Sequence, residues 1–131
     1  MRAITLLGAV LALGAAVAAH AAPPDLKLGQ AVYARCAACH SFNYDRTGPR
    51  HCALFGRRAG SLKSFEEYSK AMKNAKIVWN AKTLDRFLTN PAKTVPGTSM
   101  TYAGVPDKAE RAALIAFLKA ANGGPECHGP Q

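Results

Sequence analysis

The sequence predicts an all-α protein in which short helices are joined by ordered loops. Apolar side chains recur at helical spacing in two segments near opposite ends of the chain, 28–36 and 114–121. Between them, Pro and Gly mark turns, and no segment shows the alternation of apolar and polar residues that is typical of a strand. Both observations favour helices packed on helices over a sheet.

The earlier helices follow from their capping and stop signals. Pro23-Pro24-Asp25 begins the first helix, with the aspartate as its N-cap residue. Thr47-Gly48-Pro49 marks a turn in the irregular segment that follows. Short helices are expected at 69–74 and 83–89, and Asn90-Pro91 ends the second, because a residue before proline avoids helical backbone angles.

The clearest helix is the last one. Asp107 and Glu110 stand three residues apart in the pattern of a capping box, in which each residue's side chain satisfies a backbone N–H of the other. An apolar stripe follows at 114–121, and Gly123-Gly124-Pro125 ends the helix.

The first residues look like an export signal. Arg2 gives a positive start, 4–17 is apolar and rich in Ala and Leu, and Ala19-His20-Ala21 supplies the small residues that a signal peptidase reads. The alternative is an uncleaved membrane anchor, which the high Ala and Gly content and the immediate Pro23-Pro24 disfavour. We therefore divide the chain into a signal peptide (1–21) and one domain (22–131), which ends in a C-terminal tail (122–131).

The charge balance is strongly basic. The 131-residue chain has 17 Lys and Arg against 8 Asp and Glu, a formal net charge of +9, and loss of the signal peptide removes only Arg2 from this count. No run of like charges exists, so the charge is spread over a folded surface. Such a surface suits an acidic protein or peripheral contact with a membrane, and export to the periplasm argues against nucleic acid.

Residues 36–40 read Cys-Ala-Ala-Cys-His, the pattern by which c-type haem is attached. On a helix, Cys36, Cys39 and His40 share one face because they are three and four residues apart. Two thioether bonds can then hold one edge of a flat macrocycle while the imidazole points at its iron. The lack of a strand pattern disfavours a thioredoxin-like dithiol. The lack of a second close cysteine pair disfavours a zinc site.

Met100 offers a second iron ligand. Pro96-Gly97 fixes a tight loop just before it, and its thioether is a soft donor suited to haem iron. Met1 belongs to the predicted signal peptide, and packing is the expected role of Met72. A chain of this size cannot wrap a haem and build a separate core as well, so the haem is expected at the centre of the core. The residues expected around it are Leu54, Phe55, Trp79, Phe87, Leu88, Leu114 and Phe117.

A series of motifs runs from Gly29 to Ala121. They are Gly29 with Tyr33, Cys36-Ala37-Ala38-Cys39-His40, Thr47-Gly48-Pro49, Leu54-Phe55-Gly56-Arg57, Val78-Trp79, Asn90-Pro91, Pro96-Gly97-Thr98-Ser99-Met100 and Leu114-Ile115-Ala116-Phe117-Leu118. This series resembles class I cytochrome c, in particular its bacterial cytochrome c2 and mitochondrial branch. The resemblance implies the class I cytochrome c fold, in which helices and loops wrap around one covalent haem, with Gly29 and Tyr33 where the first helix crosses the last.

The resemblance also implies roles for individual residues. Cys36 and Cys39 would hold haem c, with His40 as the proximal and Met100 as the distal iron ligand. Pro49 would accept a hydrogen bond from His40 and so fix the orientation of its ring. The residues that would surround or hydrogen-bond the haem propionates are Arg57, Tyr68, Ser69, Trp79 and Thr98.

Three positions depart from the family pattern. His51 stands where a Leu is usual, so it needs a polar partner or exposure to water, and iron ligation by His51 is a minor alternative. Phe87 stands where many relatives carry a Tyr whose hydroxyl contacts the Met sulfur, and loss of that donor is expected to alter the reduction potential. Lys76 replaces a common Gly, and nothing in the sequence explains it.

Two further cysteines, Cys52 and Cys127, lie outside the haem motif. In an oxidising compartment a disulfide between them would tie the C-terminal tail to the loop after Pro49. The alternatives are an intermolecular disulfide and a second metal site formed with His51 and His128. The sequence leaves all three open.

His and Met ligation would leave the iron without an open position, so we expect a soluble, monomeric one-electron carrier and not an enzyme. The resemblance implies a shuttle between a bc1-type donor and a terminal oxidase or photosynthetic reaction centre. Arg35 and Lys93 are candidates for contacts with acidic docking surfaces, although Ser99 and Ala92 are uncharged where relatives often carry Lys. The alternatives are a haem sensor or peroxidase-like enzyme with a displaceable Met100, and a dedicated acceptor for one periplasmic dehydrogenase.

Overall fold

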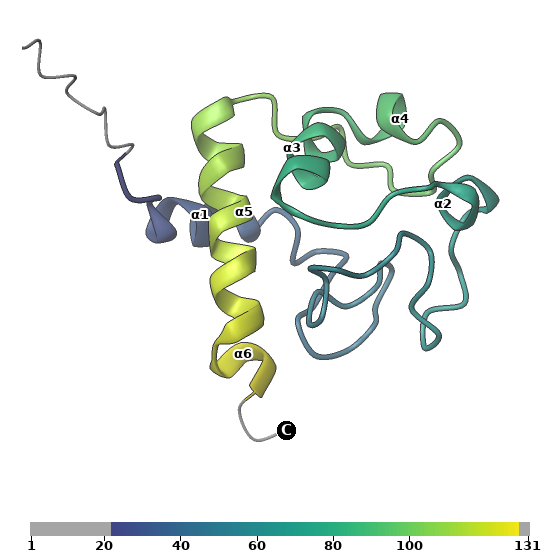
Figure 1. Ribbon diagram of the computed structural model, residues 1–131, viewed down its shortest axis with the longest axis horizontal. Coiled ribbons are helices and arrows are strands. Elements are labelled where there is room, and N and C mark those ends of the chain that lie inside the picture. The colour runs from purple at the N-terminus through teal and green to yellow at the C-terminus, as the bar shows by residue number, and fades with distance from the viewer. Residues whose placement is uncertain (1–21, 129–131) are drawn as a thin grey trace, which may run out of the picture.

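The structure is a computed structural model that describes residues 22–128; the predicted signal peptide at 1–21 and residues 129–131 lie outside this part. Its helices, shown in Figure 1, are α1 (Leu26–Tyr33), α2 (Lys70–Asn74), α3 (Ala81–Thr89), α4 (Pro91–Thr94), α5 (Lys108–Gly123) and α6 (Pro125–His128). The described residues form no strand, only an isolated bridge between Arg58 and Val78, so the predicted all-α class is confirmed. Within 22–128, no helix combines the length and the apolar character that a bilayer crossing requires.

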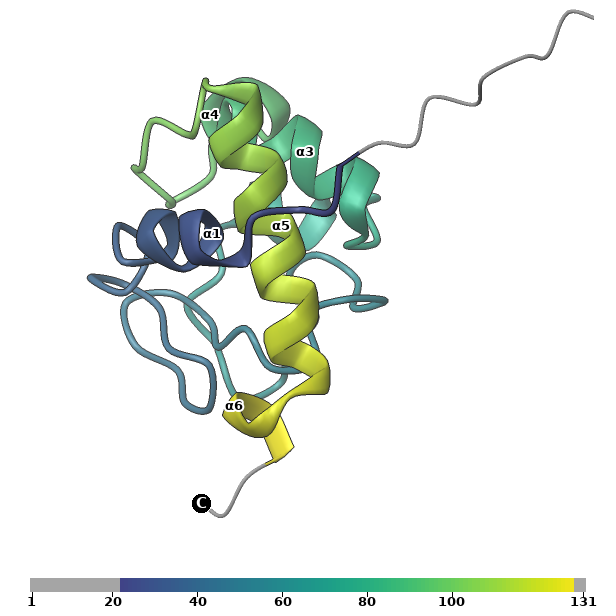
Figure 2. The same cartoon turned by 90° about the vertical axis from the view of Figure 1, so that its left-hand side faces the viewer.

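The crossing of α1 over α5 joins the two ends of the domain (Figure 2). Gly29 makes this approach close, because a Cβ atom at that position would lie 2.2 Å from the carbonyl oxygen of Ala113 and 2.6 Å from Cβ of Phe117. Val32 of α1 and Leu114 of α5 are almost completely buried in the core. The predicted contact between the first and last helices is therefore confirmed, and its closeness depends on the missing side chain at Gly29.

Helix α1 begins where the sequence predicts and ends before the haem motif. The side chain of Asp25 accepts a hydrogen bond from the first turn and serves as N-cap. After Tyr33 the chain continues in helical turns, in which the N–H of Ala37 donates to Tyr33 (3.1 Å) and that of His40 to Cys36 (2.9 Å). The Cys-Ala-Ala-Cys-His motif thus lies in turns that follow α1 and not on a regular helix, and the i to i−4 bond keeps its first and last residues one turn apart.

The short helices α2, α3 and α4 each begin at a side-chain cap. Ser69 caps α2, and Asn80 forms a reciprocal capping box with Thr83, so α3 begins earlier than predicted, at Ala81. Asn90 ends α3 and at the same time caps α4, a helix that our sequence analysis did not predict. Local polar side chains therefore set the starts of these helices.

Helix α5 shows only half of the predicted capping box. Asp107 accepts a hydrogen bond from the backbone N–H of Glu110 at 2.8 Å. The carboxylate of Glu110 instead accepts two hydrogen bonds from the guanidinium of Arg35, at 2.7 and 2.8 Å, because the α1–α5 crossing brings Arg35 alongside. Helix α5 runs to Gly123, so the first residues of the predicted tail (122–131) belong to this helix.

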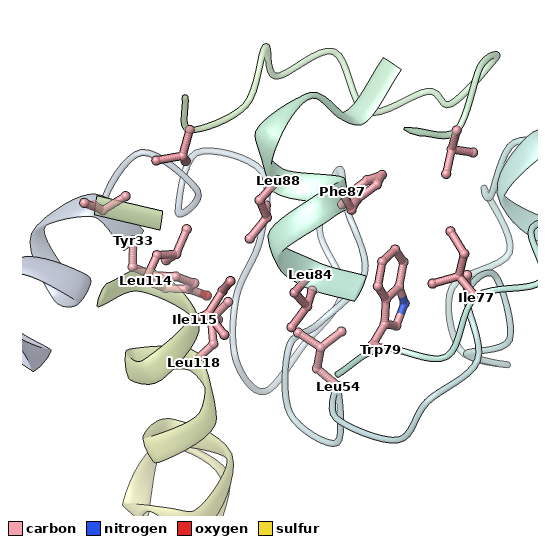
Figure 3. Close-up of a cluster of buried hydrophobic side chains, with 14 of the residues drawn as sticks. Tyr33, Leu54, Ile77, Trp79, Leu84, Phe87, Leu88, Leu114, Ile115 and Leu118 are labelled. Atoms are coloured by element: carbon pink, nitrogen blue, oxygen red, sulfur yellow. The ribbon is translucent and has the colours of Figure 1, made fainter. Parts of the chain in front are cut away.

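Buried apolar side chains from α1, α3, α5 and the loops form one cluster (Figure 3). Leu84 of α3 lies toward Ile115 and Leu118 of α5 in this view. On the other side of α3, the rings of Trp79 and Phe87 have centroids 5.0 Å apart. The cluster thus lines one side of α3 with aromatic side chains and packs the other side against α5.

A disulfide joins Cys52 to Cys127 across a sequence separation of 75 residues. It ties α6 to the loop after Pro49, and the structure therefore contains the intramolecular bridge and not either alternative. The imidazole of His128 accordingly meets the backbone oxygen of Asn122, 2.9 Å from its Nε2, and no group of three or more potential metal ligands occurs within 22–128.

We expect Gly29→Ala to lower the free energy of unfolding by about 3 kcal/mol, because the new methyl group forces the two helix backbones apart. Gly123→Ala is the matched control, since a Cβ atom there meets no atom within 4 Å. Guanidinium unfolding of both variants measures the difference. Equal midpoints for Gly29→Ala and the wild type would contradict the close crossing.

Removal of the disulfide in a Cys52→Ala/Cys127→Ala variant should lower the free energy of unfolding by about 4 kcal/mol, because the unfolded chain then regains the entropy of a long open loop. The unreduced wild-type protein should show no titratable thiol from this pair after denaturation. Two free thiols per chain would show that the bridge does not form.

Candidate functional site

A cavity of about 540 Å³, lined mainly by apolar side chains, lies between the motif segment, α3 and α5. This volume is within the range of pockets that hold cofactors. Its wall includes both motif cysteines, His40 and Met100. The motif residues are distant in the sequence from Met100, α3 and α5. Of the ten residues to which the resemblance assigns a role in binding the haem, nine line the cavity: Cys36, Cys39, His40, Pro49, Arg57, Tyr68, Trp79, Thr98 and Met100.

The two motif cysteines differ in exposure. Cys36 is half-buried beside the core, and burial raises the pKa of its thiol to about 11, against the opposing effect of the Arg35 charge. Cys39 is exposed at the cavity, and neither thiol takes part in a disulfide. Two thiols that line one apolar cavity are suitable for covalent attachment of a cofactor at one of its edges.

His40 is held at one nitrogen. Its Nδ1–H donates to the backbone oxygen of Pro49 at 2.7 Å, as the family resemblance implies. Gly48 permits this geometry, because a Cβ atom there would lie 2.4 Å from Cε1 of His40. Burial lowers the pKa of His40, so the imidazole is neutral and its Nε2 has a lone pair for a metal.

Met100 reaches the cavity from the loop after α4. The hydroxyl of Thr98 accepts a hydrogen bond from the backbone N–H of Met100 at 3.2 Å, and Gly97 adopts a left-handed conformation (φ 88°) that turns the chain. Phe87 is buried and lines the same cavity, so this position gives the methionine sulfur no hydroxyl neighbour. The thioether is thus placed in mostly apolar surroundings.

Arg57 contributes a half-buried positive charge to the cavity wall. Its guanidinium donates to the backbone oxygens of Arg50 (2.9 Å) and Cys52 (3.3 Å), while its Nε is a buried nitrogen for which the described residues offer no hydrogen-bond partner. Burial lowers the pKa of Arg57 and raises that of Tyr68, which also lines the cavity. An unsatisfied buried donor beside an apolar cavity fits a ligand that carries an acidic group.

Ser69, which the resemblance places near the haem propionates, does not line the cavity. Its hydroxyl oxygen accepts a hydrogen bond from the backbone N–H of Met72 at 3.1 Å and caps α2. The backbone N–H groups in the first turn of a helix lack partners within the helix, and the side chain of Ser69 satisfies one of them. Phe55 and Phe117 are likewise absent from the wall; Phe117 packs instead against Tyr33 and Phe42.

Several wall residues escaped the sequence analysis. They include Phe65, Leu84 and Tyr102. Leu84 is an ordinary core position of α3, so helical spacing could have found it as buried but not as a wall residue. Phe65 and Tyr102 lie in loops without regular spacing, and only the folded arrangement brings them to the cavity.

His51 lines the cavity next to His40. The two imidazole rings are stacked, with centroids 4.2 Å apart and planes 22° from parallel. Nδ1 of His51 lies 3.2 Å from the hydroxyl of Tyr33, which supplies the polar partner that this position requires. His51 is therefore placed beside the proposed ligand His40, and this arrangement does not favour His51 itself as a ligand.

The residues present fit a covalently attached haem. Two free thiols, a neutral imidazole and a thioether surround one apolar space, and this set matches the N and S donors that bind haem iron. The unsatisfied Nε–H of Arg57 is a suitable hydrogen-bond donor for a carboxylate of the same cofactor.

Comparisons with known proteins agree with this chemistry. A family model described as cytochrome c matches residues 26–122. The cytochrome c of Tetrahymena pyriformis is 45% identical over 97 residues, which cover 72% of this chain and 87% of that protein. The cytochrome c2 of Rhodomicrobium vannielii is 38% identical over 123 residues, which cover 92% of this chain and 95% of the relative.

A solved structure shows the same fold. Cytochrome cH from Methylobacterium extorquens superposes with a TM-score of 0.70 at 33% identity, and the match covers 73% of this chain and 98% of that structure. Family members carry haem c attached covalently through two cysteines and serve in electron transport. The fold, the cavity with its paired thiols and these matches together show that this chain belongs to the cytochrome c family and carries haem c.

Proposed function

We propose that the protein is a periplasmic one-electron carrier whose haem c is bound through Cys36 and Cys39 and ligated by His40 and Met100. One observation carries the proposal: the motif thiols, the imidazole fixed by Pro49 and the thioether all line a single cavity. No other segment within 22–128 brings such a donor set together.

The bound haem supplies a one-electron change of its iron. The residues of the chain would hold it in place: Cys36 and Cys39 would attach it through thioether bonds, and His40 and Met100 would provide a nitrogen and a sulfur donor. With both donors bound, no coordination position remains for a substrate, which favours electron transfer over catalysis at the metal.

The cavity wall favours the reduced state. Trp79, Leu84 and Phe87 are buried apolar side chains of the wall, and an apolar environment disfavours the additional positive charge of the oxidised iron. Methionine ligation acts in the same direction. Arg57, Tyr68, Trp79 and Thr98 are available to surround or bind the acidic propionate groups, and the unsatisfied Nε of Arg57 supports that role.

The proposed partners are redox proteins, with a bc1-type donor and a terminal oxidase or reaction centre as acceptor, approached by a monomer. The net charge of the full chain is +9, of which loss of the signal peptide removes only the charge of Arg2, and this positive balance supports attraction to acidic partners over long distances. Of the two docking candidates, Arg35 lies at the cavity but is paired with Glu110, so its charge is largely compensated. Lys93 lies on α4, outside the cavity wall.

A Met100→Ala variant should lose the absorption that a sulfur ligand gives to ferric haem, and its reduction potential should fall because the thioether no longer stabilises the reduced iron. Met72→Leu is the matched control: Met72 also lines the cavity, and the exchange nearly conserves side-chain volume. Spectra and potentiometric titrations of both variants test the ligand set. Loss of the sulfur signature in Met72→Leu, with Met100→Ala unchanged, would refute it.

The absence of a hydroxyl at Phe87 favours the alternative of a displaceable Met100 in a sensor or peroxidase-like enzyme. Carbon monoxide separates the two functions. We expect the reduced wild-type protein to bind it negligibly at neutral pH, because the thioether occupies the iron, and Met100→Ala to bind it readily. Rapid binding by the wild type would favour the sensor or enzyme.

A further inference from the structure

His51 contacts the proposed proximal ligand through its ring face. The His51 and His40 rings stack with centroids 4.2 Å apart and an interplanar angle of 22°. The hydrogen bond from Nδ1 of His40 to Pro49 fixes that ring at one atom only. A flat neighbour against the ring face restrains its tilt, a freedom that a single hydrogen bond leaves open.

The side chain of His51 is itself held in place. Its Nδ1 lies 3.2 Å from the hydroxyl of Tyr33, and the Tyr33 and His51 rings meet edge to face with centroids 5.7 Å apart. Phe42 approaches the same imidazole from another side, at a centroid distance of 6.4 Å. Two aromatic rings and one hydrogen bond therefore define the plane of His51.

The backbone of His51 is fixed by two distant segments. Its N–H donates to the backbone oxygen of Ser41 at 2.9 Å, and its carbonyl oxygen accepts a hydrogen bond from Nδ2 of Asn122 at 3.1 Å. The amide oxygen of Asn122 in turn accepts a hydrogen bond from the N–H of Leu54 at 3.0 Å. Asn122, near the end of α5, is thus hydrogen-bonded to the backbone at both ends of the segment 51–54.

The disulfide lies next to the hydrogen bonds that Asn122 makes with this segment. Cys52 follows His51 in the chain and is bonded to Cys127 of α6, while its backbone N–H donates to the oxygen of Phe42 at 2.9 Å. A continuous set of contacts therefore leads from α6 through Cys52 and Asn122 to His51, and from His51 to the ring of His40.

We propose that His51 is a positioning residue for the proximal ligand His40, and that the Cys52–Cys127 disulfide and Asn122 hold it in register. The proposal rests on the proposed function, because it takes His40 as the iron ligand. The ring plane of an axial imidazole determines how its orbitals meet the iron, so a change in tilt alters the spectroscopic signature of the ferric haem. If His51 only filled space, its substitution would leave this signature unchanged.

The decisive variants are His51→Leu and Tyr33→Phe. His51→Leu replaces the flat polar ring with a hydrocarbon, so we expect a changed spread of the ferric electron paramagnetic resonance g-values. The equilibrium with a reference redox couple should shift toward the reduced protein by roughly threefold to tenfold, because the surroundings of His40 become less polar. Tyr33→Phe removes only one hydroxyl group, so it should fold normally and broaden the same signals by loosening His51.

Coupling between the two residues provides the sharpest test. If Tyr33 acts through His51, the double variant Tyr33→Phe/His51→Leu should match His51→Leu in both spectrum and equilibrium. Tyr44→Phe serves as the control because Tyr44 is 61% exposed, and it should change neither. Additive effects in the double variant, or an unchanged signature in His51→Leu, would overturn the proposal.

The contribution of the disulfide to the position of His51 is tested with the Cys52→Ala/Cys127→Ala variant. Asn122 still holds His51 in this variant, so we expect a spectral change of the same kind as in Tyr33→Phe but no larger. An unchanged signature would remove the disulfide from the proposal. The wild-type spectrum is recorded first: if it lacks histidine ligation of a low-spin iron, the proposed function fails, whereas failure of the positioning role leaves that ligation intact.

Discussion

The crossing of α1 over α5 is the constraint on which the rest of the structure depends. At Gly29 the two helices approach so closely that even a methyl group would meet the Ala113 carbonyl oxygen. The turns that follow α1 carry the motif thiols and His40, whereas α5 contributes Leu114 and Leu118 to the cavity wall. The crossing therefore sets the distance between the attachment site and the opposite apolar wall, and it does so with backbone contacts, which side-chain motions cannot relax.

The cavity shows how a small chain builds its core around a cofactor. Leu84 and Phe87 of α3 and Trp79 before it are buried, yet all three also line the space between α3 and the motif turns. A domain of this size buries a limited apolar area, so a large prosthetic group supplies a substantial part of the interior. This explains why the loops between α1 and α2, which contain no regular helix, place His51, Leu54 and Phe65 on the cavity wall.

The C-terminal end of the domain adds a second layer of support on the side of the cavity that contains His40. Asn122 and the disulfide hold the segment that contains His51, and His51 stacks on His40. Burial, and to a smaller extent the nearby charge of Arg57, lower the pKa of His51 well below its usual value, so its ring is neutral in this environment. A polar residue at this position is tolerated because Tyr33 offers it a hydrogen bond.

The sequence alone determined the features that depend on near neighbours in the chain. The spacing of Cys36, Cys39 and His40 indicates haem attachment, and Asp25 and Asp107 mark helix starts. Each of these signals is read within a few residues, because helical turns and caps join atoms three or four positions apart.

Only the tertiary structure decided which distant groups compete for a side chain. Glu110 completes a salt bridge with Arg35 in place of its capping box, because the fold brings the two side chains together. The stacking of His51 on His40 and the wall position of Tyr102 likewise have no local signal. These outcomes depend on contacts between segments far apart in the chain, and the packing of the whole core settles them, because one polar group can satisfy only the partner that the fold brings within hydrogen-bond distance.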